Sequence, residues 1–269
     1  MMVNPTIQIS YIICSTMRSG STLLSRTLKD FDVAGDPKEY FHPRWKGVGL
    51  NQLSEPSQLY AHYNCVVQET TTPNGVFGIK MHWDQLQNVL NICRKDTAFS
   101  SKNDLEILQS FFPRPKFIFI WRENLLKQAV STEIANQTQI WGIDRDPNST
   151  RHEAKRMQLT DLKFKPMQIY RHKQSAQKCN TQWKQFFSQY SIPYHEVKFE
   201  SLISNFDSEM RGVFRCLNLP SDCSSFSMAT KKQSTPINER WAFYYRLIPE
   251  ILLEQYHERQ HLVRRSLSL

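Results

Sequence analysis

The feature that most constrains the fold of this chain is an apolar strand that ends in a polar turn. Residues 7–14 alternate between polar and apolar and then become continuously apolar, whereas residues 15–22 carry mainly hydroxyl side chains around one glycine. Apolar residues then recur at helical spacing, at Leu23, Leu24, Leu28 and Phe31. A buried strand, a tight polar loop and a helix in this order predict the first unit of an α/β fold.

Further strands alternate with helices along the chain. Residues 76–80 follow a turn signal at residues 72–75, and residues 116–121 and 194–199 also have strand composition. Helical spacing begins near Pro56 and near Leu86, and again before Phe112 in a segment for which Ser101 is the expected N-cap. We therefore expect an α/β fold, P-loop-like, with a doubly wound and mostly parallel sheet flanked by helices. At this length we predict a single domain, residues 1–269.

Cysteine spacing and hydropathy exclude several classes of protein. The six cysteines form no CxxC pair and no cluster with histidine, so neither a zinc site nor a disulfide framework is expected. The longest apolar runs are too short for a membrane-spanning helix, and the amino terminus has strand character rather than that of a signal peptide. A cytoplasmic protein with reduced thiols and no transmembrane segment is the resulting prediction.

Positive charge is concentrated in residues 151–184. The chain has a net charge of +9, and this stretch holds nine basic residues but only Glu153 and Asp161 as acids. Such a stretch attracts a nucleotide, a nucleic acid or an acidic membrane, but it is equally compatible with a solvated helix face. Both interpretations remain open at this stage.

The polar loop after the first strand has the composition of an anion-binding turn. Backbone N–H groups and the dipole of the following helix hold phosphate-like groups at such positions. The loop lacks the Gly-Lys pair of nucleoside-triphosphate P-loops, which disfavours hydrolysis of ATP or GTP. The candidate donor-binding residues here are Arg18, Ser19, Gly20, Ser21 and Thr22.

A second candidate anion site follows residues 116–121. Arg122 stands where a P-loop nucleoside triphosphatase would present an Asp that holds Mg²⁺, so no metal is expected. Ser131 lies nine residues further along, within a predicted helix. A guanidinium and a hydroxyl placed in this way can bind one phosphate together. Two anion sites without a metal predict a donor that carries phosphates at both ends.

Four segments in this order resemble the sulfotransferases that use 3′-phosphoadenosine 5′-phosphosulfate (PAPS), in particular the bacterial trehalose 2-sulfotransferase family. They are residues 18–24, 33–41, 72–80 and 128–131. The resemblance implies PAPS as co-substrate, with residues 18–22 on its 5′-phosphosulfate and Arg122 and Ser131 on its 3′-phosphate. It also implies Glu39 as general base, a C-terminal phosphate contact near Lys232, and a homodimer.

The expected reaction transfers a sulfuryl group to a hydroxyl of a carbohydrate, glycolipid or related small molecule, with Arg18, Glu39 and Lys80 as its catalytic residues. Lys80 ends a strand at the same sheet edge as the polar loop and could contact the sulfate oxygens. His42 and His82 are rival bases because imidazole titrates near neutral pH. Two other hypotheses are a P-loop kinase, which requires Mg²⁺ and ATP, and a non-catalytic polyanion-binding protein, although no nucleic-acid motif is present.

Overall fold

A computed structural model describes residues 6–42, 53–141, 161–221, 225–229 and 234–266. The chain divides into two compact units, each with its own hydrophobic core. The first unit comprises Met1–Glu123 and Cys179–Ala229, and the second comprises Asn124–Lys178 and Thr230–Leu269. The prediction of a single domain stays a prediction, because packing alone does not decide whether the two units fold independently.

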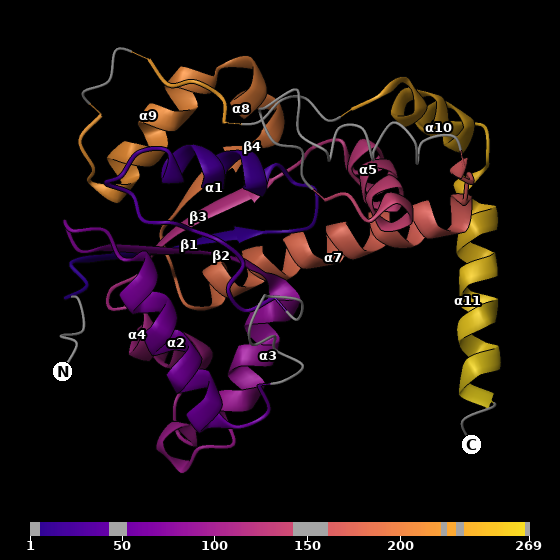
Figure 1. Cartoon of the computed structure of the whole chain (residues 1–269). Coiled ribbons are helices and arrows are strands. Elements are labelled where there is room, and N and C mark those ends of the chain that lie inside the picture. Colours follow the sequence, from indigo (N-terminus) through magenta and orange to yellow (C-terminus); the bar gives the residue numbers. More distant parts are fainter. Residues whose placement is uncertain (1–5, 43–52, 142–160, 222–224, 230–233, 267–269) are drawn as a thin grey trace. The chain divides into compact units, whose positions relative to one another are not determined.

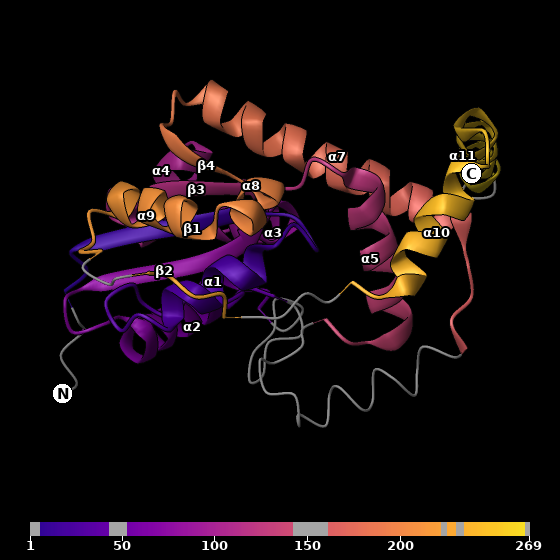
Figure 2. The ribbon, with the colours of Figure 1, turned by 90° about the horizontal axis from the view of Figure 1, so that it is seen from above.

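The first unit contains a parallel four-stranded sheet in the order β2-β1-β3-β4 (Figures 1 and 2). Each strand coincides closely with a strand predicted from the sequence. They are β1 (Ile9–Ser15), β2 (Val76–His82), β3 (Lys116–Trp121) and β4 (Tyr194–Lys198). Because parallel neighbours need crossover connections, helices must intervene between the strands. The predicted α/β class with a parallel sheet is confirmed.

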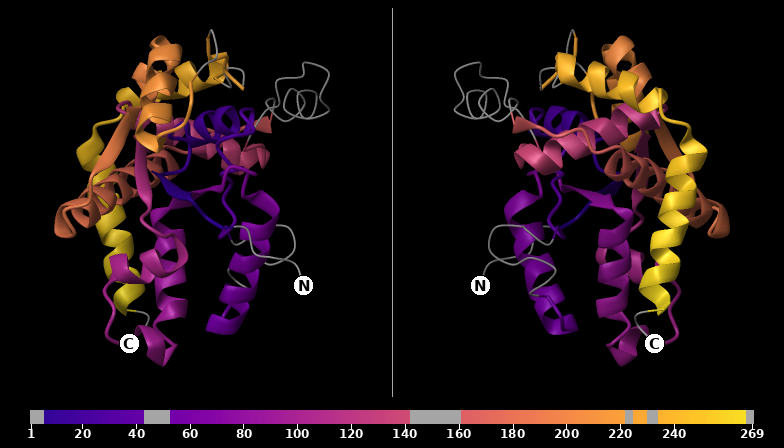
Figure 3. Two further views of the ribbon diagram at one scale, coloured as in Figure 1. Left: turned by 90° about the vertical axis from the view of Figure 1, so that its left-hand side faces the viewer. Right: turned by 90° about the vertical axis from the view of Figure 1, so that its right-hand side faces the viewer.

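Helices cover both faces of this sheet (Figures 1 and 3). Alternate residues of a strand point to opposite faces, and accordingly Ile12 belongs to one core and Ile13 to the other. The core around Ile13 is closed by α1 (Ser21–Lys29), α8 (Phe199–Ser204) and α9 (Phe206–Leu217). The core around Ile12 is closed by α2 (Pro56–Thr70), α3 (Trp83–Cys93), α4 (Asp104–Phe111) and the last turns of α7 (Pro166–Gln189).

The start of α4 corrects one expectation. Asn103, not Ser101, is the N-cap: its Oδ1 accepts a hydrogen bond from the N–H of Glu106 at 3.0 Å. The Glu106 carboxylate accepts one in return from the N–H of Asn103 at 2.8 Å. This reciprocal capping box satisfies two backbone donors that the helix leaves unbonded, which is why the helix begins there. A short 3₁₀ turn, η1 (Thr97–Phe99), precedes it.

The second unit is helical where it is described. It contains α5 (Leu125–Thr138), the first turns of α7, α10 (Pro236–Arg246) and α11 (Glu250–Ser266). Ala129, Val130 and Ile134 form the inner face of α5 and are buried in the core that α10 completes through Trp241. Within the described ranges, none of the helices is both long and apolar enough to span a membrane.

Candidate active site

The polar segment of residues 15–22, which joins β1 to the first turn of α1, has the backbone form of an anion-binding turn. It is called the anion-binding loop below. Arg18 and Gly20 both adopt left-handed conformations, with φ of 61° and 95°. A Cβ on Gly20 would lie only 2.3 Å from the ring of Phe199, so no other residue fits there without rearrangement. Gly20 is also the N-cap of α1, whose first-turn N–H groups therefore open onto the loop.

Ser19 is a buried hydroxyl within this loop. Its side chain is fully inaccessible, and its Oγ has no hydrogen-bond partner among the described protein atoms. A buried polar atom of this kind costs free energy unless a ligand or water bonds it. The loop therefore holds a hydroxyl that is available to a bound group.

Two arginines of the first unit lie near each other beside the loop. Burial, and then the positive charge of Arg122, lowers the pKa of Arg18 to about 10. The Arg122 guanidinium lies 4.6 Å from the centre of the Phe199 ring, and its Nε is 3.7 Å from Glu200 Oε1. Phe199 thus contacts Arg122 and also fills the space that the missing side chain of Gly20 leaves. An anion bound beside the two guanidinium groups would offset their mutual repulsion.

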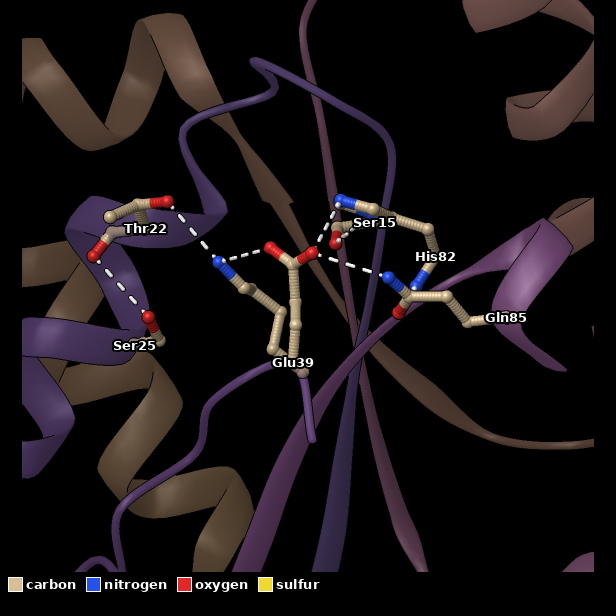
Figure 4. Close-up of polar contacts among 7 residues, drawn as sticks. Ser15, Thr22, Ser25, Glu39, His82 and Gln85 are labelled. Atoms are coloured by element: carbon tan, nitrogen blue, oxygen red, sulfur yellow. Dashed lines mark hydrogen bonds and ion pairs between the residues drawn. The ribbon is translucent and has the colours of Figure 1, made fainter. Parts of the chain in front are cut away.

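Glu39 lies at the centre of a second group of polar side chains (Figure 4). Its Oε1 is 2.8 Å from the Lys80 ammonium, and its Oε2 accepts a hydrogen bond from Gln85 Nε2 at 3.2 Å. His82 Nε2 lies 3.5 Å from the same Oε2. The Lys80 ammonium also donates to Thr22 Oγ1 at 3.2 Å, so it joins Glu39 to the anion-binding loop.

Strand register brings these side chains together. Lys80 and His82 are alternate residues of β2 and point to one face, opposite Ile13 and Ser15 of β1. Ser15 Oγ lies 3.0 Å from His82 Nδ1. The segment that carries Glu39 follows the edge of β2, where the N–H of Lys80 donates to the carbonyl of residue 38 at 2.9 Å. The group therefore sits at the carboxyl ends of β1 and β2, where open α/β sheets bind ligands.

The charge state of Glu39 follows from these contacts. Burial by itself would raise the pKa of Glu39, but the charges of His82 and Lys80 and the hydrogen bonds from Lys80 and Gln85 hold it well below its ordinary value. Glu39 is consequently ionised at neutral pH. A carboxylate with so low a pKa is a weak proton acceptor for as long as Lys80 remains beside it.

The structure brings some of the predicted site residues together. Glu39, Lys80 and Thr22 are joined by direct contacts, and Arg18 lies near Arg122. Ser131 lies on α5 of the second unit, where it is partly exposed. Of the two rival bases, His82 contacts the Glu39 carboxylate, whereas His42 is linked to Glu39 through its backbone N–H.

Sequence reasoning missed Ser15, Gln85 and Phe199. Gln85 had a detectable signal, because it stands three residues after His82 and completes the capping box of α3 by accepting the His82 N–H at 3.0 Å. The place of Phe199 depends on the packing of β4 and α8 against the loop, which no local pattern records.

The predicted phosphate contact at Lys232 and the basic stretch of residues 151–184 are described only in part. Lys232 and residues 151–160 of the basic stretch fall outside the described ranges. In the described remainder, Lys173 pairs with Glu250 at 2.7 Å, and Lys184 lies 3.9 Å from Glu196. Part of the positive charge of this stretch is therefore balanced by ion pairs with glutamates of the same chain. The described residues contain no group of three or more His, Cys, Asp or Glu that could hold a metal ion.

Comparison with known proteins finds a family model and relatives that match this chain. The family model of the Stf0 sulphotransferases matches residues 10–247. Trehalose 2-sulfotransferase of Mycobacterium tuberculosis is 31% identical over 162 residues, which cover 51% of this chain and 60% of the relative. The enzyme of the same name from Mycolicibacterium smegmatis is 28% identical over 164 residues, covering 51% of this chain and 61% of the relative. The chain thus spans about three fifths of the length of these relatives.

Solved structures give more distant likenesses. A sulfotransferase domain from the Curacin biosynthetic pathway aligns with 80% of this chain and 75% of its own at 13% identity and a TM-score of 0.36. The sulfotransferase domain of the Synechococcus PCC 7002 olefin synthase aligns with 96% of this chain and 97% of its own at 15% identity and the same TM-score. The fold class therefore rests on strand order and register.

The fold and the anion-binding loop define a P-loop-like α/β protein. Because the family model spans most of its length, the chain belongs to the Stf0 sulphotransferase family. The predicted resemblance to the trehalose 2-sulfotransferases is confirmed by the two mycobacterial relatives.

Proposed function

We propose that this protein is a PAPS-dependent sulfotransferase that transfers a sulfuryl group to a hydroxyl group of a small molecule. The observation that carries the proposal is the double contact of Lys80, which joins the Glu39 carboxylate to Thr22 of the anion-binding loop. A proton acceptor and an anion site in direct connection are what transfer to a hydroxyl requires. Membership of the Stf0 sulphotransferase family supports the same reaction.

In the proposed reaction the acceptor oxygen attacks sulfur as the bond from sulfur to the 5′-phosphate oxygen breaks. Glu39 takes the hydroxyl proton, and the products are a sulfate ester and 3′-phosphoadenosine 5′-phosphate. The loop, Arg18 through Thr22, would bind the phosphosulfate, and Arg18 and Lys80 would stabilise the negative charge that grows on the leaving phosphate. Arg122 and Ser131 are the proposed ligands of the 3′-phosphate. None of these roles requires a metal ion.

A carbohydrate is the proposed acceptor class. The names of the two mycobacterial relatives refer to trehalose, which supports a sugar or glycolipid as the molecule to test first. Sugar hydroxyls are weak acids, so their attack on sulfur benefits from a carboxylate base.

A homodimer and a cytoplasmic location complete the proposal. Six of the large apolar side chains that are exposed in the described chain lie on α10, α11 and the turn between them, within the second unit. They are Phe243, Tyr244, Leu247, Ile251, Leu252 and Tyr256. Exposed apolar side chains on two successive helices support self-association. The free thiols of the described cysteines support a reducing compartment.

Calorimetric titration with 3′-phosphoadenosine 5′-phosphate, in parallel with ATP and Mg²⁺, tests the donor site. We expect tight binding without metal, and Arg122→Ala should weaken it about 10- to 100-fold because a charge-assisted contact to phosphate is lost. Arg114→Ala is the matched control, since Arg114 is an exposed arginine at the opposite end of β3. It should leave the affinity unchanged.

Two outcomes would contradict the proposal. Absence of nucleotide binding would remove the donor, and a preference for ATP with Mg²⁺ would move the kinase hypothesis to first place. Equal losses in Arg122→Ala and Arg114→Ala would indicate nonspecific attraction to a basic surface, in agreement with the polyanion-binding hypothesis. If the nucleotide binds as expected, transfer of ³⁵S from PAPS to a panel of sugars identifies the acceptor.

A further inference from the structure

Lys80 holds two partners at once, and only one of them belongs to the anion-binding loop. Its side chain is 7% exposed, with the ammonium 2.8 Å from Glu39 Oε1 and 3.2 Å from Thr22 Oγ1. Thr22 lies in the first turn of α1, the part of the loop that faces a bound anion. The ammonium is therefore already positioned between the carboxylate and the place where negative charge would arrive.

The contacts in the described structure are unfavourable for catalysis by Glu39. An ammonium at 2.8 Å stabilises the ionised carboxylate and so opposes proton uptake from a hydroxyl. The hydrogen bond from Gln85 and the approach of His82 act in the same direction. At least one of these three interactions must therefore weaken before Glu39 can accept a proton efficiently.

We propose that the 5′-phosphosulfate of the bound donor draws the Lys80 ammonium away from Glu39, so that Glu39 becomes a competent base only when the donor is in place. This inference rests on the proposed function. The transfer needs only a side-chain movement, because Lys80 already contacts the loop through Thr22. Lys80 is then both a ligand of the leaving group and a positioning residue that couples donor occupancy to proton acceptance.

The other groups around Glu39 define what remains after Lys80 has moved. His82 of β2 stays near Oε2, held from its other side by Ser15 of β1, and Gln85 of α3 keeps its hydrogen bond. On the segment of Glu39 itself, Asp36 and Lys38 pair with each other. Lys80 is thus the charged partner of Glu39 that a bound anion can attract most directly.

The direct test is to measure the pKa of Glu39 by carboxyl ¹³C NMR, with Glu39→Gln used to assign the signal. Saturating 3′-phosphoadenosine 5′-phosphate should raise the pKa of Glu39 by about 1–3 units, the usual effect of one neighbouring charge. Adenosine 3′-phosphate, which offers nothing to the loop, should leave it unchanged. In Lys80→Met the pKa should already be raised without nucleotide, and further addition should change it little.

The outcomes distinguish failure of this inference from failure of the proposed function. Nucleotide binding without a change in the pKa of Glu39 would overturn the inference alone. An equal rise in wild type and Lys80→Met would assign the effect to the phosphate charge itself and would also overturn it. Absence of binding in calorimetry would overturn the proposed function, and the inference with it. If Lys80→Met does not fold, Lys80→Gln serves the same comparison, and the wild-type titration needs neither variant.

Discussion

Each unit of this protein contains a glutamate with a histidine and a glutamine as partners, but the two clusters differ in burial and in their other contacts. In the second unit, Glu133 accepts from Gln137 Nε2 at 2.7 Å and lies 3.1 Å from His172 Nε2. In the first unit, Glu39 has the corresponding partners Gln85 and His82. In the described part of the chain, the cluster of Glu39 also includes Lys80, whose ammonium contacts Thr22 of the anion-binding loop.

The difference separates a structural carboxylate from one suited to chemistry. Glu133 belongs to helix α5, its side chain is 4% exposed, and its contacts link α5 to α7 within the second unit. Glu39 belongs to an irregular segment at the carboxyl ends of the strands, and its side chain is 23% exposed. Both carboxylates have a lowered pKa, so the shift alone does not mark the active site. Accessibility and the link to the loop are what distinguish Glu39.

The largest expected effect comes from Glu39→Gln. An amide cannot accept the acceptor proton, so kcat should fall about 10²- to 10⁴-fold. Glu133→Gln is the matched control, with the same substitution in the other cluster, and should keep kcat within a few-fold of wild type. Sulfuryl transfer from PAPS, measured below the unfolding temperature of both variants, makes the comparison. Equal losses would remove the distinction between the two clusters.

The next largest expected effect is a change in the free energy of unfolding of the Glu133→Gln variant. Glu133→Gln replaces a charge-assisted contact with His172 by a neutral one in a site with little access to water, so the free energy of unfolding should fall by about 1–3 kcal/mol. Glu239→Gln is the control within the same unit, because the Glu239 carboxylate is 58% exposed and pairs with Lys127 at 2.9 Å. That variant should change stability by about 0.5 kcal/mol or less. Urea unfolding monitored by circular dichroism provides both values.

Substitution of the two glutamines, Gln85 beside Glu39 and Gln137 beside Glu133, should give a smaller difference between the clusters. Gln85→Ala removes a hydrogen bond to the ionised carboxylate of Glu39 and should therefore displace the pH dependence of kcat upward. Gln137→Ala should instead lower the free energy of unfolding by about 1 kcal/mol and leave that pH dependence unchanged. A displaced pH profile in both variants, or in neither, would count against separate roles.

The smallest expected effect is the loss, at acid pH, of the contribution that Glu133 makes to the free energy of unfolding. Burial acts to raise the pKa of Glu133, but hydrogen bonds from His172 and Gln137 and the charges of His172 and Lys165 lower it below its usual 4.5. A carboxyl whose pKa is lowered by folding stabilises the protein above its unfolded pKa and loses that contribution as the pH falls. The stability difference between wild type and Glu133→Gln should therefore shrink from pH 7 to pH 4. A constant difference would mean that packing, not charge, accounts for it.

Local pattern predicted much of the first unit. The strands β1, β2 and β3 and the loop after β1 follow from apolar runs bounded by turn residues. The start of α4 was placed two residues early, because Ser101 and Asn103 can both cap a helix and only the reciprocal bonds of Glu106 decide between them. Helices α8 to α11 were not predicted, since their boundaries lack a comparably clear signal.

The sequence by itself determined the alternation of strands and helices, the composition of the anion-binding loop, and the family to which the chain belongs. Those properties depend on residues close together along the chain and on motifs in a fixed order. Tertiary structure alone decided that Lys80 contacts both Glu39 and Thr22, that Gln85 completes this cluster, and that Phe199 packs against Gly20 and Arg122. Such contacts arise from the parallel register of β1 and β2 and from the packing of α8 beside the loop, and neither leaves a periodic trace in the sequence.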